Sequence, residues 1–168
     1  KGADVLIKAM AKIVIESPEV ELVFVGEGIL KEGVKELSKK LNVDEHVKFT
    51  GFVSDEIKKM YYKASDIFVL PSFFDTFGIV LLEASAFGLP LVVSNIGAFK
   101  GFIKDDYNGI VTKLGDEKYL AEKIIYLLEN EELRKKLGRN AREQVGDYSW
   151  EKIAEKTEKL YERVLNEW

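Results

Sequence analysis

Two carboxylates, Asp75 and Glu83, stand eight residues apart within the otherwise almost wholly apolar segment PSFFDTFGIVLLEASAFGLP at positions 71–90. A helix that is apolar on every face is normally buried, and an ionised carboxylate there is costly unless a partner compensates its charge. The sequence therefore predicts that Glu83 meets a structural cation, a hydrogen-bonding ligand or water in a cleft.

A glycine stands where the helix of this segment is expected to begin. A helix over 77–87 leaves the amides near Gly78, Ile79 and Val80 without intrahelical acceptors. Such a terminus binds anions, and a glycine lets a phosphate approach the backbone. Two plainer interpretations stay open: Asp75 is only the helix cap beside a packing glycine, and Glu83 forms a structural ion pair.

Helix-like and strand-like patterns alternate along the chain. Apolar residues at helical spacing predict helices over 3–16, 29–41, 55–63, 77–87, 117–129, 131–143 and 150–166. Short apolar runs predict strands over 21–25, 47–50, 66–70, 91–94 and 109–111. Ser54, Asp116 and Ser149 are the predicted helix N-caps.

This alternation predicts an α/β fold with a doubly wound, Rossmann-like parallel sheet and C-terminal helices, as one domain over residues 1–168. Ligands of such sheets bind beyond the carboxyl ends of the strands. Gly26-Glu27-Gly28 lies at one such end, but Lys31 stands where a dinucleotide fingerprint needs its third glycine. A nicotinamide or flavin site is therefore disfavoured.

Composition excludes several classes of function. The net charge of −4 and the absence of a basic patch argue against nucleic-acid binding. No cysteine is present, and Asp105-Asp106 lacks a third ligand nearby, so no metal site is expected. Prolines, glycines and carboxylates interrupt the apolar stretch at 67–93, so no transmembrane segment is expected. The first residues run directly into an amphipathic helix pattern, so no signal peptide is expected. The Lys- and Glu-rich composition, with one glutamine, is typical of thermophile proteins.

The segment PSFFDTFGIVLLEASAFGLPLVVSNIGA resembles the donor-site signature of retaining glycosyltransferases of the GT4 family, which have the two-domain GT-B fold. The resemblance covers the chain, since Lys1-Gly2, FVGEG at 24–28, VKFTGFVSD at 47–55, SDIFVLPS at 65–72 and the terminal SWEKIAEKTEKLYERV follow in the family's order. It implies transfer of a hexosyl group from a UDP-, GDP- or ADP-sugar to an acceptor hydroxyl.

The resemblance also implies roles for individual residues. Glu83 would accept hydrogen bonds from the donor's ribose hydroxyls, and Asp75 would lie near the sugar and diphosphate as the catalytic carboxylate. Lys1 would bind the diphosphate in place of a metal, so no metal and no cofactor are expected. The backbone at the start of the helix would hold the diphosphate and sugar, through Phe77, Gly78, Ile79 and Val80. The backbone at the end of a strand would border the nucleobase, through Phe52 and Val53.

Three departures from the family pattern accompany the resemblance. Asp75 replaces the usual glutamate, Gly101 stands where the family carries another glutamate, and the chain starts after the family's first strand and phosphate-binding arginine. The acceptor-binding N-terminal domain is absent as well, so the fragment alone is expected to be inactive.

The expected location is the cytoplasm, with membrane contact through the missing domain left open. A nucleotide-sugar 2-epimerase and a non-catalytic nucleotide-sugar-binding homologue remain alternatives.

Overall fold

The computed structural model describes residues 1–166, and its elements follow the order that the sequence predicts. The helices are α1 (Ala3–Glu16), α2 (Lys31–Lys40), α3 (Asp55–Ala64), α4 (Ile79–Ala86), α5 (Glu117–Glu129), α6 (Glu131–Val145) and α7 (Trp150–Asn166). The strands are β1 (Leu22–Val25), β2 (Val47–Gly51), β3 (Phe68–Leu70), β4 (Leu91–Ser94) and β5 (Gly109–Thr112). Short 3-10 helices at Asp44–His46, Gly97–Phe99 and Gly146–Tyr148 were not predicted.

The strands form two parallel sheets, β1-β2 and β3-β4-β5. Strand β4 lies in the middle of its sheet, and all four of its residues are buried. A strand that is buried throughout fits this place, because helices cover both faces of a parallel sheet. The predicted α/β fold class, Rossmann-like with parallel strands and C-terminal helices, is confirmed.

Side-chain caps set three helix starts as predicted. The Ser54 hydroxyl accepts a hydrogen bond from the Ile57 amide (3.4 Å), and the Asp116 carboxylate accepts one from the Tyr119 amide (2.9 Å). The Ser149 hydroxyl accepts one from the Lys152 amide (3.3 Å) at the start of α7. Each cap satisfies an amide that has no partner inside its helix.

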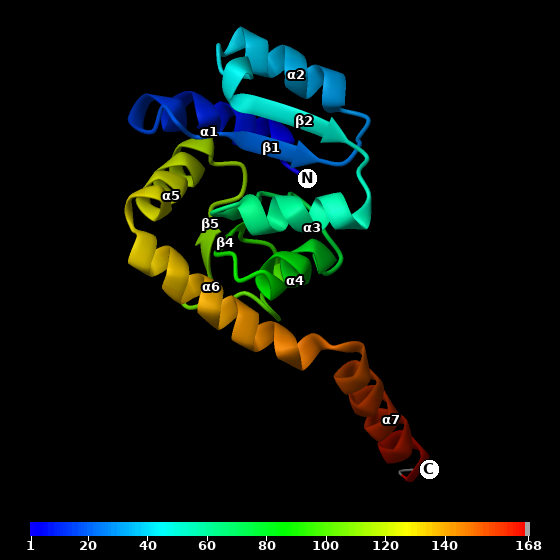
Figure 1. Ribbon diagram of the computed structural model, residues 1–168. Helices are drawn as coiled ribbons and strands as arrows, with labels where there is room; N and C mark the ends of the chain where they lie inside the picture. Colours follow the sequence, from blue (N-terminus) through cyan, green and yellow to red (C-terminus); the bar gives the residue numbers. More distant parts are fainter. Residues whose placement is uncertain (167–168) are drawn as a thin grey trace.

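Helix α1 occupies the centre of the larger core cluster. Its buried face packs against α5 and α2, and the same cluster includes residues of β1, β2 and β4. Figure 1 shows α1 and α5 side by side, with α6 continuing the chain beneath them. A second cluster joins β3, β4 and α4.

No hydrogen-bonded pairing joins β1 to β3 within residues 1–166, although both contribute side chains to the same core cluster. All four residues of β1 are apolar, yet none of them is buried. Gly2 is the N-cap of α1, and a Cβ there would collide with the Pro71 carbonyl oxygen just beyond β3. A strand leading into Lys1 would therefore end beside the carboxyl end of β3, parallel to it. We propose that such a strand joins the two sheets.

A polypeptide extended upstream of Lys1 should consequently be more stable than residues 1–168 alone. Pairing the free edges of β1 and β3 satisfies backbone groups and covers the apolar side chains of β1. We expect a melting temperature higher by about 4 °C or more, which corresponds to about 1–2 kcal/mol for a chain of this length. Equal melting temperatures for the two polypeptides in thermal unfolding would show that the strand is wrongly placed.

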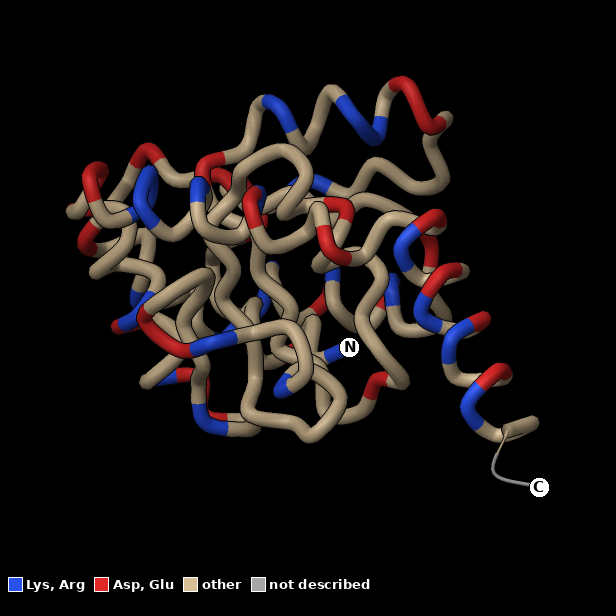
Figure 2. The backbone as a smooth tube through the Cα atoms, turned by 90° about the horizontal axis from the view of Figure 1, so that it is seen from below, with Lys and Arg blue, Asp and Glu red and all other residues tan. Residues whose placement is uncertain are grey.

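Helix α7 extends away from the rest of the molecule (Figure 1), and no residue in it is buried. Lys and Arg alternate with Glu along it, as Figure 2 shows for the helix that leads to the C-terminus. Among residues 1–166, no helix is long and apolar enough to cross a membrane.

Candidate functional site

The loop before α4 is held by the carboxylate of Asp75. Its Oδ1 accepts hydrogen bonds from the amides of Thr76 (2.9 Å), Phe77 (3.3 Å) and Gly78 (3.0 Å). This is the pattern by which aspartate stabilises a turn, and it brings Gly78 into the left-handed conformation (φ 79°) from which α4 begins. The N-cap of α4 is Gly78, so the interpretation of Asp75 as the helix cap was wrong: its Oδ1 instead holds the loop that precedes the cap.

The second oxygen of Asp75 bonds to the ammonium group of Lys1. The two residues are 74 positions apart, and the close approach of Gly2 to Pro71 brings Lys1 to this edge of the sheet. The Asp75 side chain is only 8% exposed. The hydrogen bond from Lys1, with the amides of Phe77 and Gly78, lowers the pKa of Asp75 below its usual range. Asp75 thus stays ionised at neutral pH.

The open amides at the start of α4 are fewer than the sequence predicts. Those of Phe77 and Gly78 already donate to Asp75. Those of Ile79 and Val80 have no hydrogen-bond partner within the described chain, and Ile79 is 64% exposed. The positive end of the helix dipole is therefore open at these two amides, beside the Lys1 ammonium.

Glu83 lies one helical turn beyond Ile79 on α4 and has two partners on α3. Its Oε1 accepts a hydrogen bond from the Lys58 ammonium (3.2 Å), and its Oε2 accepts one from the Tyr62 hydroxyl (2.9 Å). Lys58 also pairs with Asp55 (3.1 Å). The bonds to Asp55 and Glu83 raise the pKa of Lys58, and burial together with the Glu83 carboxylate raises the pKa of Tyr62.

The expectation that α4 is buried on every face was wrong. Leu81, Ala84 and Ser85 are buried, but the Glu83 side chain is 33% exposed. Only one side of this short helix packs on the sheet and α6, and the side carrying Glu83 faces α3. Glu83 has a structural cation and remains accessible to a ligand, so the two interpretations of this residue are compatible.

Phe52 and Val53 follow the carboxyl end of β2 and precede the Ser54 cap of α3. Phe52 is 87% exposed, which is unusual for an aromatic side chain because such rings are stabilised by burial. The helix that these two residues lead into also carries Lys58, which contacts Glu83. The end of β2 is thereby connected to the same site as α4.

Lys58 and Tyr62 were missed from the sequence. They stand four residues apart on α3, and Asp55 stands three residues before Lys58, so the three share one face of the helix. This polar stripe indicates that the three side chains act together, but the sequence pattern alone does not show which helix the stripe faces.

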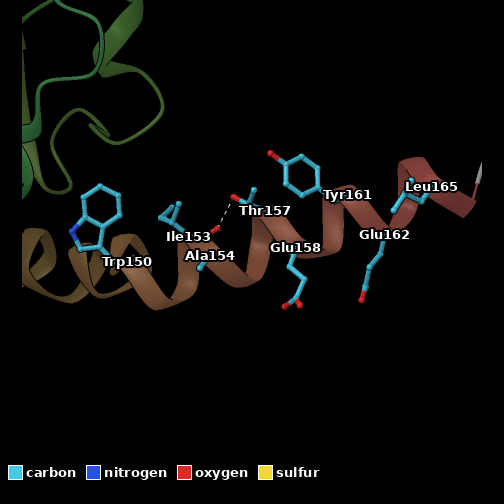
Figure 3. Close-up of a pocket in the computed structure, with 8 residues that line it drawn as sticks. All are labelled: Trp150, Ile153, Ala154, Thr157, Glu158, Tyr161, Glu162 and Leu165. Carbon is cyan, nitrogen blue, oxygen red and sulfur yellow. Dashed lines mark hydrogen bonds between the residues drawn. The ribbon is translucent and has the colours of Figure 1, made fainter.

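Other candidate features lie apart from this site. Residues 1–166 contain no group of three or more His, Asp or Glu side chains that could hold a metal ion. A pocket lies along α7 (Figure 3) and is lined by Trp150, Ile153, Ala154, Thr157, Glu158, Tyr161, Glu162 and Leu165. Since all eight residues come from one projecting helix, this is an exposed helix face rather than an enclosed cavity.

Parallel strands and their covering helices define a Rossmann-like α/β domain, and the helix start with open amides, a lysine and two carboxylates is its candidate ligand site. The family model of the glycosyl transferases group 1 matches residues 1–144, and the chain belongs to this family.

Relatives and solved structures agree with this assignment. The chain is 37% identical over 166 residues to an uncharacterized glycosyltransferase of Methanocaldococcus jannaschii, covering 98% of this chain and 42% of the relative. It is similar to sucrose-phosphate synthase from Thermosynechococcus elongatus, with a TM-score of 0.88 and 29% identity over 100% of this chain and 43% of that one. It is also similar to the Anabaena protein HepE in complex with UDP-glucose, with a TM-score of 0.79 and 26% identity over 88% of this chain and 41% of that one. The chain therefore spans less than half the length of these proteins.

Proposed function

We propose that this chain is the nucleotide-sugar-binding domain of a retaining glycosyltransferase, which transfers a hexosyl group to an acceptor hydroxyl bound by the rest of the protein. The observation that carries the proposal is the meeting of Lys1, Asp75 and the open amides of Ile79 and Val80 at the start of α4, with Glu83 one turn away. Family membership supports sugar transfer as the reaction.

The spacing along α4 suits a nucleoside diphosphate. Four residues of α-helix span about 6 Å, so an anion at the amides of Ile79 and Val80 leaves Glu83 about that far along the helix. We assign the diphosphate to these amides and Lys1, and the ribose hydroxyls to Glu83. Phe52 and Val53 would then border the nucleobase.

The charges suit the departure of a diphosphate. Negative charge grows on this leaving group as the bond to the sugar breaks, and a fixed cation beside it stabilises the transition state. Lys1 lies against Asp75, so a diphosphate held by Lys1 places the sugar next to the Asp75 carboxylate. Because Asp75 stays ionised, it can stabilise positive charge that develops at the anomeric carbon.

Uracil is the first nucleobase to test, because HepE was solved with UDP-glucose. Guanine and adenine nucleotides are tested beside the uracil nucleotide. Retention of configuration, independence from metal and a cytoplasmic location also stay predictions.

A nucleotide-sugar 2-epimerase is not favoured, since the family model is that of glycosyl transferases. Assaying epimer formation beside glycosyl transfer by the full-length protein separates the two activities. A non-catalytic homologue would bind donor and give neither product.

The proposal is tested by titrating residues 1–168 and an upstream-extended polypeptide with UDP, GDP and ADP in a calorimeter. We expect one of the three to bind, weakly to the short polypeptide, and the affinity to be unchanged by EDTA because Lys1 supplies the compensating charge. The short polypeptide should transfer no sugar, since half of the cleft is missing. Absence of binding to both polypeptides would refute the proposed function, and a large loss of affinity in EDTA would refute the role given to Lys1.

A further inference from the structure

The carboxylate of Glu83 is held at both oxygens by donors from a neighbouring helix. Lys58 bonds to Oε1 at 3.2 Å and Tyr62 bonds to Oε2 at 2.9 Å, and the two donors stand one turn apart on α3. A glutamate side chain otherwise rotates about three bonds, and ordering it costs conformational entropy when a ligand arrives.

We propose that Lys58 and Tyr62 are positioning residues, which fix the plane of the Glu83 carboxylate before the ribose of the donor binds. This inference rests on the proposed function, in which Glu83 accepts the ribose hydroxyls. Preorganisation of this kind raises affinity by removing the cost of ordering the side chain during binding.

The carboxylate keeps enough acceptor capacity for a ligand. An ionised carboxylate offers about four lone-pair positions, and the two donors occupy one on each oxygen. About two positions therefore remain for the two neighbouring hydroxyls of a ribose. Glu83 is 33% exposed, so these positions can be reached from solvent.

Tyr62 is well placed to act as a fixed donor. Its ring packs against those of Phe68 and Phe87, at centroid distances of 5.9 and 5.4 Å. Burial and the neighbouring carboxylate raise its pKa, so the hydroxyl keeps its proton. This protonated hydroxyl donates to Glu83 at 2.9 Å.

Lys58 is held from two sides. Its ammonium pairs with Asp55 at 3.1 Å and with Glu83 at 3.2 Å. Asp55 is the first residue of α3, three positions after Phe52. Lys58 therefore connects the segment assigned to the nucleobase with the carboxylate assigned to the ribose.

The test compares affinities for a ribonucleotide and for its 2′- and 3′-deoxy forms, using whichever of UDP, GDP and ADP binds best. The upstream-extended protein is titrated as wild type, Lys58→Met, Tyr62→Phe and Lys58→Arg. Wild type should prefer the ribonucleotide by about tenfold or more, as expected for a hydrogen bond to a charged acceptor. Lys58→Met and Tyr62→Phe should each reduce this preference by about threefold or more, and Lys58→Arg should retain most of it.

Lys59→Met is the matched control, since Lys59 is the exposed neighbour on α3 and has no ion pair within residues 1–166. It removes the same charge and should leave the preference unchanged. A merely structural role of Lys58 or Tyr62 would lower the affinities for all nucleotides together and leave their ratio intact.

Four outcomes distinguish the positioning role from the proposed function. An unchanged preference in both Lys58→Met and Tyr62→Phe would overturn the positioning role. An increased preference in Lys58→Met would also overturn it, by showing that Lys58 competes with the ribose. If Glu83→Gln leaves the preference for the ribonucleotide unchanged, the ribose contact in the proposed function is refuted. If Glu83→Gln abolishes this preference while Lys58→Met and Tyr62→Phe do not reduce it, only the positioning role is refuted.

Discussion

Glu83→Gln should weaken the binding of the preferred nucleoside diphosphate by about 1.5–3 kcal/mol, which is roughly 10- to 150-fold in dissociation constant. Glutamine keeps the shape of the side chain and one acceptor oxygen, but it loses the charge that strengthens hydrogen bonds from ribose hydroxyls. The binding constant is measured by calorimetry, and the melting temperature by thermal unfolding of the same preparation.

The melting temperature should change little in this variant. The Lys58–Glu83 pair is about one-third exposed on both sides, and exposed ion pairs contribute about 0–1 kcal/mol. Lys58 also keeps Asp55 as a partner, so no cation is left unpaired. Glu36→Gln, which changes an exposed glutamate on α2, is the control. A large fall in melting temperature, with affinity lost only in proportion to unfolding, would mean that Glu83 is structural.

Most of the fold could be predicted because local patterns determine it. The spacing of Val5, Leu6, Ala9, Met10 and Ile13 predicts α1, and all five are buried in the core. Ser54 and Asp116 cap α3 and α5 because their side chains reach the amide three residues on. In these places the sequence signal and the tertiary structure demand the same conformation.

The surroundings of Glu83 could not be predicted in the same way. A helix that reads IVLLEASA has no polar face from which its buried side could be identified, so its exposed side was assumed to be buried. The partners of Glu83 come from α3, 25 and 21 residues earlier, and only the packing of α3 beside α4 brings them close. The pairing of Lys1 with Asp75 likewise depends on the approach of Gly2 to Pro71.

The loop before α4 shows that a structural role and a ligand-facing role of Asp75 do not exclude each other. Cap and ligand-facing carboxylate were opposed interpretations of Asp75. In the structure Asp75 is not the helix cap, which is Gly78; one of its oxygens accepts hydrogen bonds from the loop amides and the other meets Lys1. A single carboxylate has enough acceptor positions to bind the loop amides and Lys1 at the same time. Because each oxygen serves a different partner, a mutation that keeps one oxygen and removes the charge separates the two roles.

Asp75→Asn in the full-length protein should lower turnover by about 100-fold, with a much smaller loss of affinity for the free nucleoside diphosphate. Asparagine can keep an oxygen toward the amides of Thr76 and Gly78, so the loop and the start of α4 are retained. It removes the negative charge beside Lys1 and the sugar, and loss of one electrostatic group of this kind typically costs about 100- to 1000-fold in rate. Steady-state kinetics and nucleotide titration of the same variant give the two quantities.

Asp75→Ala supplies the comparison, because it removes the loop acceptor as well. It should cost about 1–2 kcal/mol of stability, whereas Asp75→Asn should cost less. The ionised form is the one that binds Lys1 and the amides, so the pKa of Asp75 is lower in the folded protein than its ordinary 3.8. Its contribution to stability is therefore present above about pH 4 and is lost as the pH falls through the lowered pKa, and Asp75→Asn should flatten that acid dependence. If Asp75→Asn melts like wild type and turns over at the wild-type rate, Asp75 only holds the loop and its catalytic role is refuted. The donor contacts of Glu83 are then judged by their own variant.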